Sequence, residues 1–354
     1  MKTLDPNPGY QPIPDNLKSD FFNSLEYIGD LFDETDKWHI WCTSPIDGPD
    51  GKVHLFASRW PLEAGHQGWG VCCEIAHAVS DRPEGPFQFT DVVFQGKGGS
   101  AWNAQAPHNP TIHRYGDQYA LFYIARTLGG VPKDQRIGLL LSDSLYGPWK
   151  EAGDGPVLEP SEQAGDWDHA SLNGVNNPAF LHHPNGECWL YYKAKRQSED
   201  FPSMGLAIAE KIEGLYRRLP EPVASIGSTL EDAYAYIENG KFYLLTTDNR
   251  GYIKKKGGLL FESADGMHFN DVKAGFDTLA GYAGSGIKTE HVPGKPNLVY
   301  GFERPQILMR DGRPAYLYVT TRVNFMTEDS SVTDVVKGSS SYVLRIRQER
   351  RENG

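Results

Sequence analysis

Three carboxylates stand where two apolar segments begin, and their types and positions suit acid–base chemistry. Glu231 and Asp232 precede the segment AYAYI, and Glu303 precedes Arg304 and the segment PQILM. Two carboxyl groups across a narrow pocket can cleave a glycosidic bond, one as an acid and one as a base or nucleophile. Crowded carboxylates also raise one another's pKa, which keeps one of them protonated. Structural ion pairs, such as Glu303 with Arg304, are the alternative interpretation.

Two further residues are candidates for the same chemistry. His108 stands directly before Asn109 and could act as a general acid, as an orienting partner or as a metal ligand, or could make a structural hydrogen bond. Asp168 follows Asp166 and Trp167, and it would supply another carboxylate if this stretch loops over the pocket. Its alternative is a turn-forming Asp in a solvent-exposed loop.

The segments that carry these residues recur along the chain. Each starts with a polar residue, usually followed by Pro, and continues as an apolar strand, a Gly turn with Asn or Asp, and an aromatic-rich strand. The starts are Ser44, Asn109, Asn177, Asp232 and Arg304. Turns such as HPNGE and IENGK are typical of β-hairpins. Five such repeats with almost no helical periodicity predict an all-β fold, a five-bladed β-propeller, with an irregular β-sandwich as the alternative.

The repeats also set the expected domain limits. We expect residues 1–37 to form an irregular N-terminal arm with one short helix around Asp15–Leu25. Residues 38–354 should form a single five-bladed propeller, in which the segment SYVLRIR supplies a strand to the last or the first blade and closes the ring.

A propeller brings the starts of its innermost strands together at one mouth of the central channel, and each second strand returns there. The predicted inner ring contributes Asn109, Asn177 and Arg304 to substrate binding, and the second strands contribute Arg59, Arg126, Lys193 and Arg322. Arg binds carboxylate and sulfate groups bidentately, so this basic ring favours an anionic sugar, although Arg is also common at surface strand ends. Trp41 and Trp102 could stack on sugar faces or belong to the core.

The composition limits the classes of protein that the chain can belong to. It has 354 residues, 39% of them apolar, and a formal net charge of −11. The acidic balance argues against nucleic acid or an anionic membrane as a partner, and no apolar run approaches the roughly 18 residues of a membrane span. The start MKTLDPNPGY lacks the apolar region of a signal peptide, so a periplasmic and a cytoplasmic location both stay open.

Neither a metal site nor a disulfide framework is visible. The four cysteines include no Cys-x-x-Cys pair, so we expect buried, reduced thiols. No metal ligand is assigned, because no His and Asp cluster has metal-ligand spacing. A structural Ca²⁺ in the central channel, held partly by water, stays open as a cofactor since it would leave little trace in the sequence. Association into a homo-oligomer also stays open.

The motifs WNAQAPHNPTI, NNPAFLHHPNGECWLYYKA and LEDAYAYIENGKFYLL resemble those of the five-bladed propeller glycoside hydrolases of families 43 and 117. The resemblance covers roughly residues 38–345 and implies a glycosidase of polysaccharide degradation. Family 43 enzymes use an Asp base at the first inner strand, a pKa-tuning Asp at the third and a Glu acid at the fourth. The fourth position carries Glu231, but the third carries Asn177 and the first Ser44. The histidine acid of family 117 draws attention to His108.

These observations predict an exo-acting glycoside hydrolase that releases a sugar from an anionic plant or algal oligosaccharide. Its acid/base set would be Glu231, Asp232 and Glu303. One alternative is a propeller that binds carbohydrate without catalysis, because the usual base is missing. The other is a lyase acting on a uronate, with His108, Tyr234 or Tyr236 abstracting the proton.

Overall fold

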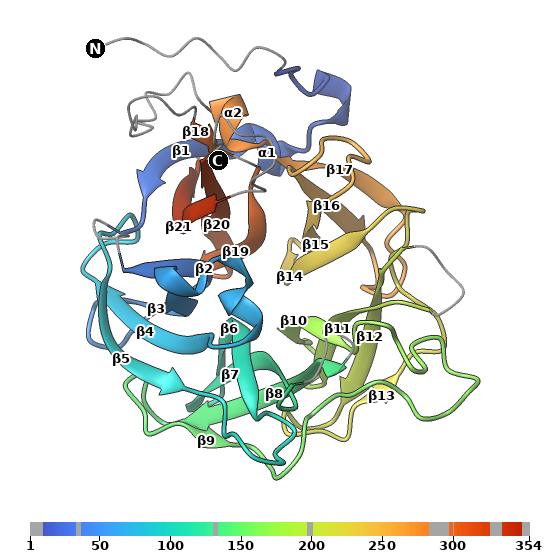
Figure 1. Ribbon diagram of the computed structural model, residues 1–354. Coiled ribbons are helices and arrows are strands. Elements are labelled where there is room, and N and C mark those ends of the chain that lie inside the picture. The colour runs from blue at the N-terminus through green and yellow to red at the C-terminus, as the bar shows by residue number, and fades with distance from the viewer. Residues whose placement is uncertain are drawn as a thin grey trace.

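Strand pairing in the computed structural model follows the repeats of the sequence. The structure describes residues 10–32, 37–129, 134–196, 201–282, 297–299, 301–325 and 335–348. Its strands group into five antiparallel sheets arranged around a central axis, which is the predicted five-bladed β-propeller (Figure 1). Among the described residues, no helix is long and apolar enough to cross a membrane.

The first four blades each contain four strands, ordered along the chain from the axis outward. The first blade consists of β2 (Trp38–Asp47), β3 (Val53–Pro61), β4 (Glu74–Ser80) and β5 (Gln88–Phe94). The second consists of β6 (Gln105–Tyr115), β7 (Gln118–Arg126), β8 (Arg136–Ser142) and β9 (Lys150–Glu151). The third consists of β10 (Asn176–His182), β11 (Cys188–Ala194), β12 (Ser203–Ala209) and β13 (Arg217–Arg218). The fourth consists of β14 (Leu230–Glu238), β15 (Lys241–Asp248), β16 (Gly258–Ser263) and β17 (Asp271–Phe276).

The fifth blade joins the two ends of the chain. It contains β19 (Glu303–Arg310), β20 (Arg313–Phe325), β21 (Val335–Ile346) and β1 (Leu25–Asp30), and β18 (Asn297–Val299) pairs with the end of β20. The segment SYVLRIR, apart from its last residue, lies in β21, so the prediction that it supplies a strand to the last or the first blade is confirmed for the last blade. Strand β1 pairs antiparallel with β21, with Leu25 opposite Ile346, and this pairing closes the ring.

The N-terminal segment is more regular than the expected arm. The short helix α1 (Asp20–Ser24) begins where the Ser19 side chain accepts a hydrogen bond from the Phe22 amide. The chain continues from α1 directly into β1. In β1, Tyr27 and Ile28 pack against two different buried clusters of the ring. The other α-helix among the described residues is α2 (Leu279–Tyr282), and 3₁₀ turns occupy Asp15–Leu17, Leu62–Ala64 and His66–Gly70.

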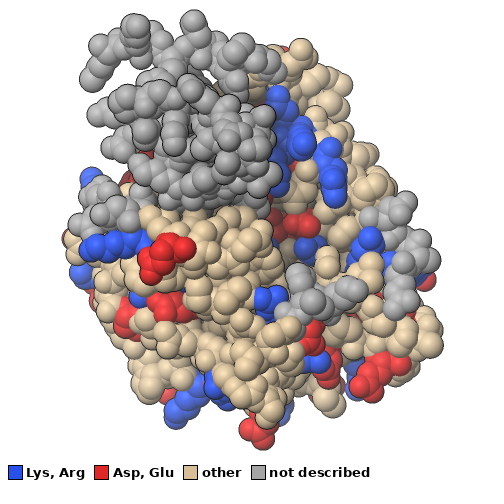
Figure 2. Space-filling model, viewed as in Figure 1, with Lys and Arg blue, Asp and Glu red and all other residues tan. Residues whose placement is uncertain are grey.

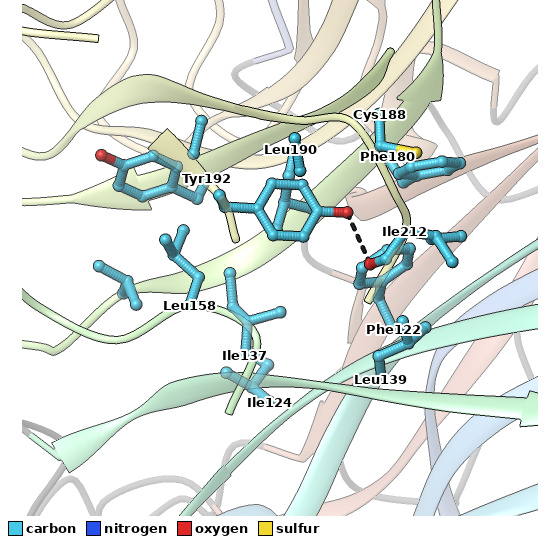
Figure 3. Close-up of a cluster of buried hydrophobic side chains, with 14 of the residues drawn as sticks. Phe122, Ile124, Ile137, Leu139, Leu158, Phe180, Cys188, Leu190, Tyr192 and Ile212 are labelled. Atoms are coloured by element: carbon cyan, nitrogen blue, oxygen red, sulfur yellow. Dashed lines mark hydrogen bonds between the residues drawn. The ribbon is translucent and has the colours of Figure 1, made fainter. Parts of the chain in front are cut away.

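Hydrophobic clusters fill the spaces between neighbouring blades. Figure 3 shows the cluster between the second and third blades, where Phe122 of β7 stacks on Phe180 of β10 with ring centroids 5.0 Å apart. The buried thiol of Cys188 belongs to the same cluster. Cys42 and Cys73 are buried as expected, but Cys72, in the segment between β3 and β4, is exposed.

One bulge recurs in the innermost strand of every blade. Cys42, Asn109, Asn177, Asp232 and Arg304 have φ values of 49°, 53°, 52°, 64° and 58°, and the register to the second strand slips beside each of them. Such a bulge interrupts the alternation of side chains, so it re-aims consecutive residues toward the axis. The sequence repeat placed Ser44 at the start of the first segment. The bulge of the first blade lies at Cys42, so Cys42 is the residue equivalent to Asn109. Ser44 instead donates a hydrogen bond to Gln306 of the fifth blade.

Candidate active site

The bulges border a cavity of about 300 Å³ at one mouth of the axis. Side chains from all five blades line it, namely Trp41, Ser58, Trp60, His66, Trp69, His108, Asn109, Gln135, Asn173, Asn176, Asn177, Lys193, Glu231, Glu303 and Arg304. Figure 2 shows acidic and basic side chains next to each other near the middle of the molecule's face. A depression of about 340 Å³ near α1 and the turn between β14 and β15 is slightly larger, but none of the bulge residues lines it.

Glu231 is held as an anion in this cavity. Its Oε1 lies 3.2 Å from the Lys193 Nζ, and its Oε2 accepts a hydrogen bond from the Asn249 amide at 2.6 Å. Burial raises the pKa of the Glu231 carboxyl, but the charges of Lys193 and Arg304 outweigh that effect and lower it overall. The carboxylate is therefore ionised at neutral pH and suited to act as a base or nucleophile.

Glu303 reaches the cavity from the next blade and pairs with Lys256, not with the adjacent Arg304. The Lys256 ammonium also donates to the Asn249 Oδ1. Asn249 therefore links the two carboxylates, since it binds Glu231 directly and Glu303 through Lys256. The turn after β15 carries Asn249 and Lys256. The Asp248 carboxylate shapes this turn by accepting four backbone N–H bonds, from Gly251 through Lys254.

Asp232 lies behind the cavity wall instead of lining it. Its Oδ1 lies 2.9 Å from the Arg304 Nη1 and accepts from the Asn177 amide at 2.9 Å, and its Oδ2 accepts from the Thr247 hydroxyl at 2.9 Å. The side chain is 1% exposed, and burial raises its pKa while Arg304 opposes the rise. These contacts suit a residue that positions its neighbours rather than one that touches substrate.

His108 is a neutral imidazole at the mouth of the channel. Its Nδ1 lies 2.7 Å from the Ala106 carbonyl oxygen, which can only accept, so Nδ1 carries the proton. The unprotonated Nε2 lies 3.3 Å from the Gln135 amide nitrogen, which donates to it. Burial, followed by the charge of Arg304, lowers the pKa of His108 to about 3. A neutral imidazole with this tautomer accepts a hydrogen bond at Nε2 and offers no proton there.

Aromatic rings form the side of the cavity contributed by the first blade. Trp41 and Trp60 come from β2 and β3, and His66 and Trp69 come from the segment that links β3 to β4. The segment folds tightly over Trp60, whose indole N–H donates to the Gly65 carbonyl at 2.9 Å. Gly68 is required for this packing, because a Cβ there would lie 2.4 Å from the Trp60 ring. The rings face a polar side made by the other blades.

The structure brings most of the predicted site residues to this cavity. Those that line it are His108, Asn109, Asn177, Lys193, Glu231, Glu303, Arg304 and Trp41, with Asp232 directly behind them. Arg322 lies on β20, but its side chain falls outside the described part of the structure.

Four predicted residues lie elsewhere. The Asp168 carboxylate is fully buried and binds Arg218 at 2.8 Å and Tyr192 at 3.1 Å within the third blade, so this stretch does not loop over the pocket. Arg59 pairs with Glu74 and lies over the Trp38 and Phe89 rings. Arg126 packs against the segment His66–Gly70. Its Nη2 is so close to Gly70 that a Cβ added there would lie 2.9 Å from it. Trp102 stacks on Tyr123 in the core.

Sequence reasoning missed the residues that loops add to the cavity. Among the residues that line the cavity, His66 and Trp69 precede β4 and Gln135 precedes β8. Asn249 and Lys256, which bind Glu231 and Glu303, precede β16. All of them lie in connections from the second to the third strand of a blade. These connections begin where the second strand returns to the mouth, so they could have been included on topology alone.

The chain has the fold of the five-bladed propeller glycoside hydrolases, as the resemblance implied. It is similar to Zg3597, a family 117 glycoside hydrolase of the marine bacterium Zobellia galactanivorans, over 91% of this chain and 89% of that one, with a TM-score of 0.62 and 17% identity. It is also similar to the arabinanase Arb43A of Bacillus subtilis, over 90% and 96% of the two chains, with a TM-score of 0.53 and 14% identity. A third similar structure is a family 43 enzyme of Xanthomonas citri, with a TM-score of 0.57, 13% identity and 93% of each chain covered. No family model and no curated protein matches the sequence.

Proposed function

We propose that the protein is a glycoside hydrolase that cleaves an oligosaccharide in the axial cavity, with Glu231 and Glu303 as its two reacting carboxyl groups. The observation that carries the proposal is that these two side chains, from neighbouring blades, line one cavity whose first-blade side is aromatic. Glycoside hydrolysis needs such a pair, and aromatic rings suit the apolar faces of sugars.

The contacts of Glu231 support one of the two roles, and the other role then falls to Glu303. Lys193 and Asn249 hold Glu231 in its ionised form, so Glu231 acts as the base or the nucleophile. Glu303 is then the proton donor to the departing sugar oxygen, and it must take up a proton before each turnover. Asp232 and His108 act as positioning residues, because one lies behind the wall and the other is neutral with both ring nitrogens hydrogen-bonded.

The size and the charge of the cavity bear on the substrate. A volume of about 300 Å³ is at the lower end for ligand pockets, which favours binding one end of a chain and hence exo-action. Glu231, Asp232 and Glu303 pair with Lys193, Arg304 and Lys256 respectively. Because each of these three described cations already has an acidic partner, an anionic sugar would compete with the internal ion pairs. Neutral oligosaccharides are therefore tested as substrates alongside anionic ones.

The test is a product screen by mass on neutral, uronate-bearing and sulfated oligosaccharides, with Glu231→Gln and Glu303→Gln as variants. On the substrate that the wild type hydrolyses, each variant should lose roughly 10²- to 10⁴-fold in kcat while it still unfolds in a cooperative thermal transition. Glu221→Gln is the matched control, because this side chain is 72% exposed on the surface. Its kcat should equal that of the wild type.

Three results would contradict the proposal. Full activity in both variants would remove the two carboxylates from the mechanism. An unsaturated product with ultraviolet absorbance would identify a lyase. Sugar binding without turnover of any substrate would identify a propeller that only recognises carbohydrate.

A further inference from the structure

Four side chains from four blades meet at the axis, where three of them also line the cavity. The Arg304 Nη1 lies 2.6 Å from the Asn177 Oδ1 and 2.9 Å from the Asp232 Oδ1. With the Asn109 amide oxygen turned toward the guanidinium, that oxygen accepts from Nη2 at 2.7 Å and from Nη1 at 2.8 Å. The guanidinium thus sits in a cage of oxygens supplied by the second, third and fourth blades, while its own backbone belongs to the fifth.

Oxygens of carboxylate and amide groups are also the ligands that Ca²⁺ takes in proteins. A calcium ion in the channel would need these same oxygens, and it would face the positive charge of Arg304 at close range. The axis therefore does not fit a channel calcium ion. Among the described residues, no three His, Cys, Asp or Glu side chains come together as a metal site elsewhere.

We propose that Arg304 is the internal cation of this propeller, and that it links the second to the fifth blades where a channel metal ion would otherwise do so. Arg suits the task because its planar guanidinium presents several N–H donors in fixed directions, so it can bind oxygens from three blades at once. The side chain of Asp232 is 1% exposed, and an unpaired charge there would be strongly unfavourable.

The same contacts fix the backbone that carries the cavity carboxylates. Glu231 and Glu303 immediately precede Asp232 and Arg304, whose φ values of 64° and 58° lie in the left-handed region. The Arg304 amide N–H also donates to the Thr247 hydroxyl at 3.3 Å, and that hydroxyl donates to Asp232. The ion pair thus holds both bulges in place. This inference concerns the axis and does not depend on the proposed function.

The first experiment measures the Tm of the wild-type protein with EDTA and with added CaCl₂. We expect the same Tm in both. A Tm that EDTA lowers or that CaCl₂ raises would overturn the inference, because it would reveal a structural metal ion in this chain.

Variants then test Arg304 itself. Arg304→Met should lower the Tm by roughly 5 °C, since it leaves Asp232 buried without its partner. Asp232→Asn combined with Arg304→Met should lower it by less than the sum of the two single changes. Arg304→Ala should acquire a Tm that rises with CaCl₂, because the oxygens are then free. The matched control is Arg310→Met, on the same strand and 40% exposed, with little expected change.

An Arg304→Met Tm equal to that of Arg310→Met would overturn the inference, as would fully additive single changes. If the Arg304 variants do not fold, Asp232→Asn with and without CaCl₂ replaces them. This variant should be less stable than the wild type and insensitive to calcium, and a calcium-dependent Tm would contradict the proposal.

Discussion

At the scale of single residues, the partners of each ionisable group separate chemistry from support. Glu231 and Glu303 line the cavity and contact lysines, whereas Asp232, one residue along from Glu231, is buried in the axis. His108 shares the cavity but is neutral, because burial and nearby cations disfavour its protonated form. Adjacent residues of similar type therefore have different tasks, which their surroundings determine.

The neutral state of His108 predicts how stability depends on pH. Its pKa is about 3 in the folded protein, below the 6.5 of an ordinary histidine, so its stabilising contribution is complete above pH 6.5 and decreases as the pH falls toward 3. Within that window its share of the unfolding free energy should fall by about 1.4 kcal/mol per pH unit. His108→Gln removes the titration, so the difference in unfolding free energy between wild type and variant should narrow with acidification. Urea unfolding of both proteins at about pH 7 and about pH 5 measures this difference. A constant difference would contradict the neutral state of His108.

At the scale of elements, the segment between β3 and β4 shapes the cavity more than any strand start in the first blade. It supplies His66 and Trp69, and its fold over Trp60 depends on Gly68. The first blade lacks a carboxylate at its bulge, where Cys42 stands, and offers rings instead. This difference between blades gives the cavity one apolar side and one charged side.

The apolar side should contribute to substrate binding more than to the chemical step. Trp69→Ala is expected to raise KM by roughly tenfold on the substrate found in the screen, with a smaller effect on kcat, because a stacking surface is lost. Trp102→Phe is the control, since Trp102 packs on Tyr123 away from the cavity, and its KM should match the wild type. An equal rise in both variants, or none in Trp69→Ala, would contradict the role of this segment.

At the scale of the whole molecule, the propeller is closed by strands from opposite ends of the chain. Strand β1 pairs with β21, and Tyr27 of β1 packs on the rings of Tyr282 and Tyr342 at 6.1 and 6.3 Å. The N-terminal segment is thus part of the ring rather than an appendage. Axial contacts through Arg304 and peripheral contacts through β1 stabilise the same fifth blade from its two edges.

Loss of the packing around Tyr27 should weaken this closure. Tyr27→Ala is expected to lower the Tm by roughly 2–4 °C, as about 2 kcal/mol of packing is lost in a protein of this size. Glu26→Ala, on the same strand with an exposed side chain, should change the Tm little. Thermal unfolding of both variants decides the point, and equal Tm values would show that β1 does not secure the ring.

The sequence by itself determined the fold class, the strand pairs and most of the cavity lining. Period-two apolar strands with Gly turns are local features, and their repeats place Asn109, Asn177, Asp232 and Arg304 at equivalent positions. Glu231 and Glu303 stand one residue before this position. The prediction for Arg59 is wrong because a strand-end position does not specify which side chain it meets across the blade, here Glu74. The prediction for Asp168 is wrong because the sequence does not specify where a long connection packs, and its carboxylate binds Arg218 instead.

Only the tertiary structure decided which charge meets which. Glu303 pairs with Lys256 and not with its neighbour Arg304, since the bulges turn consecutive side chains toward different partners. The Arg304 guanidinium can take the place of a channel cation only because oxygens from three other blades surround it. These oxygens lie far from Arg304 in the sequence, so no local pattern predicts the contacts. Long-range contacts set the charge, burial and orientation of these groups, and those properties determine what each group can do.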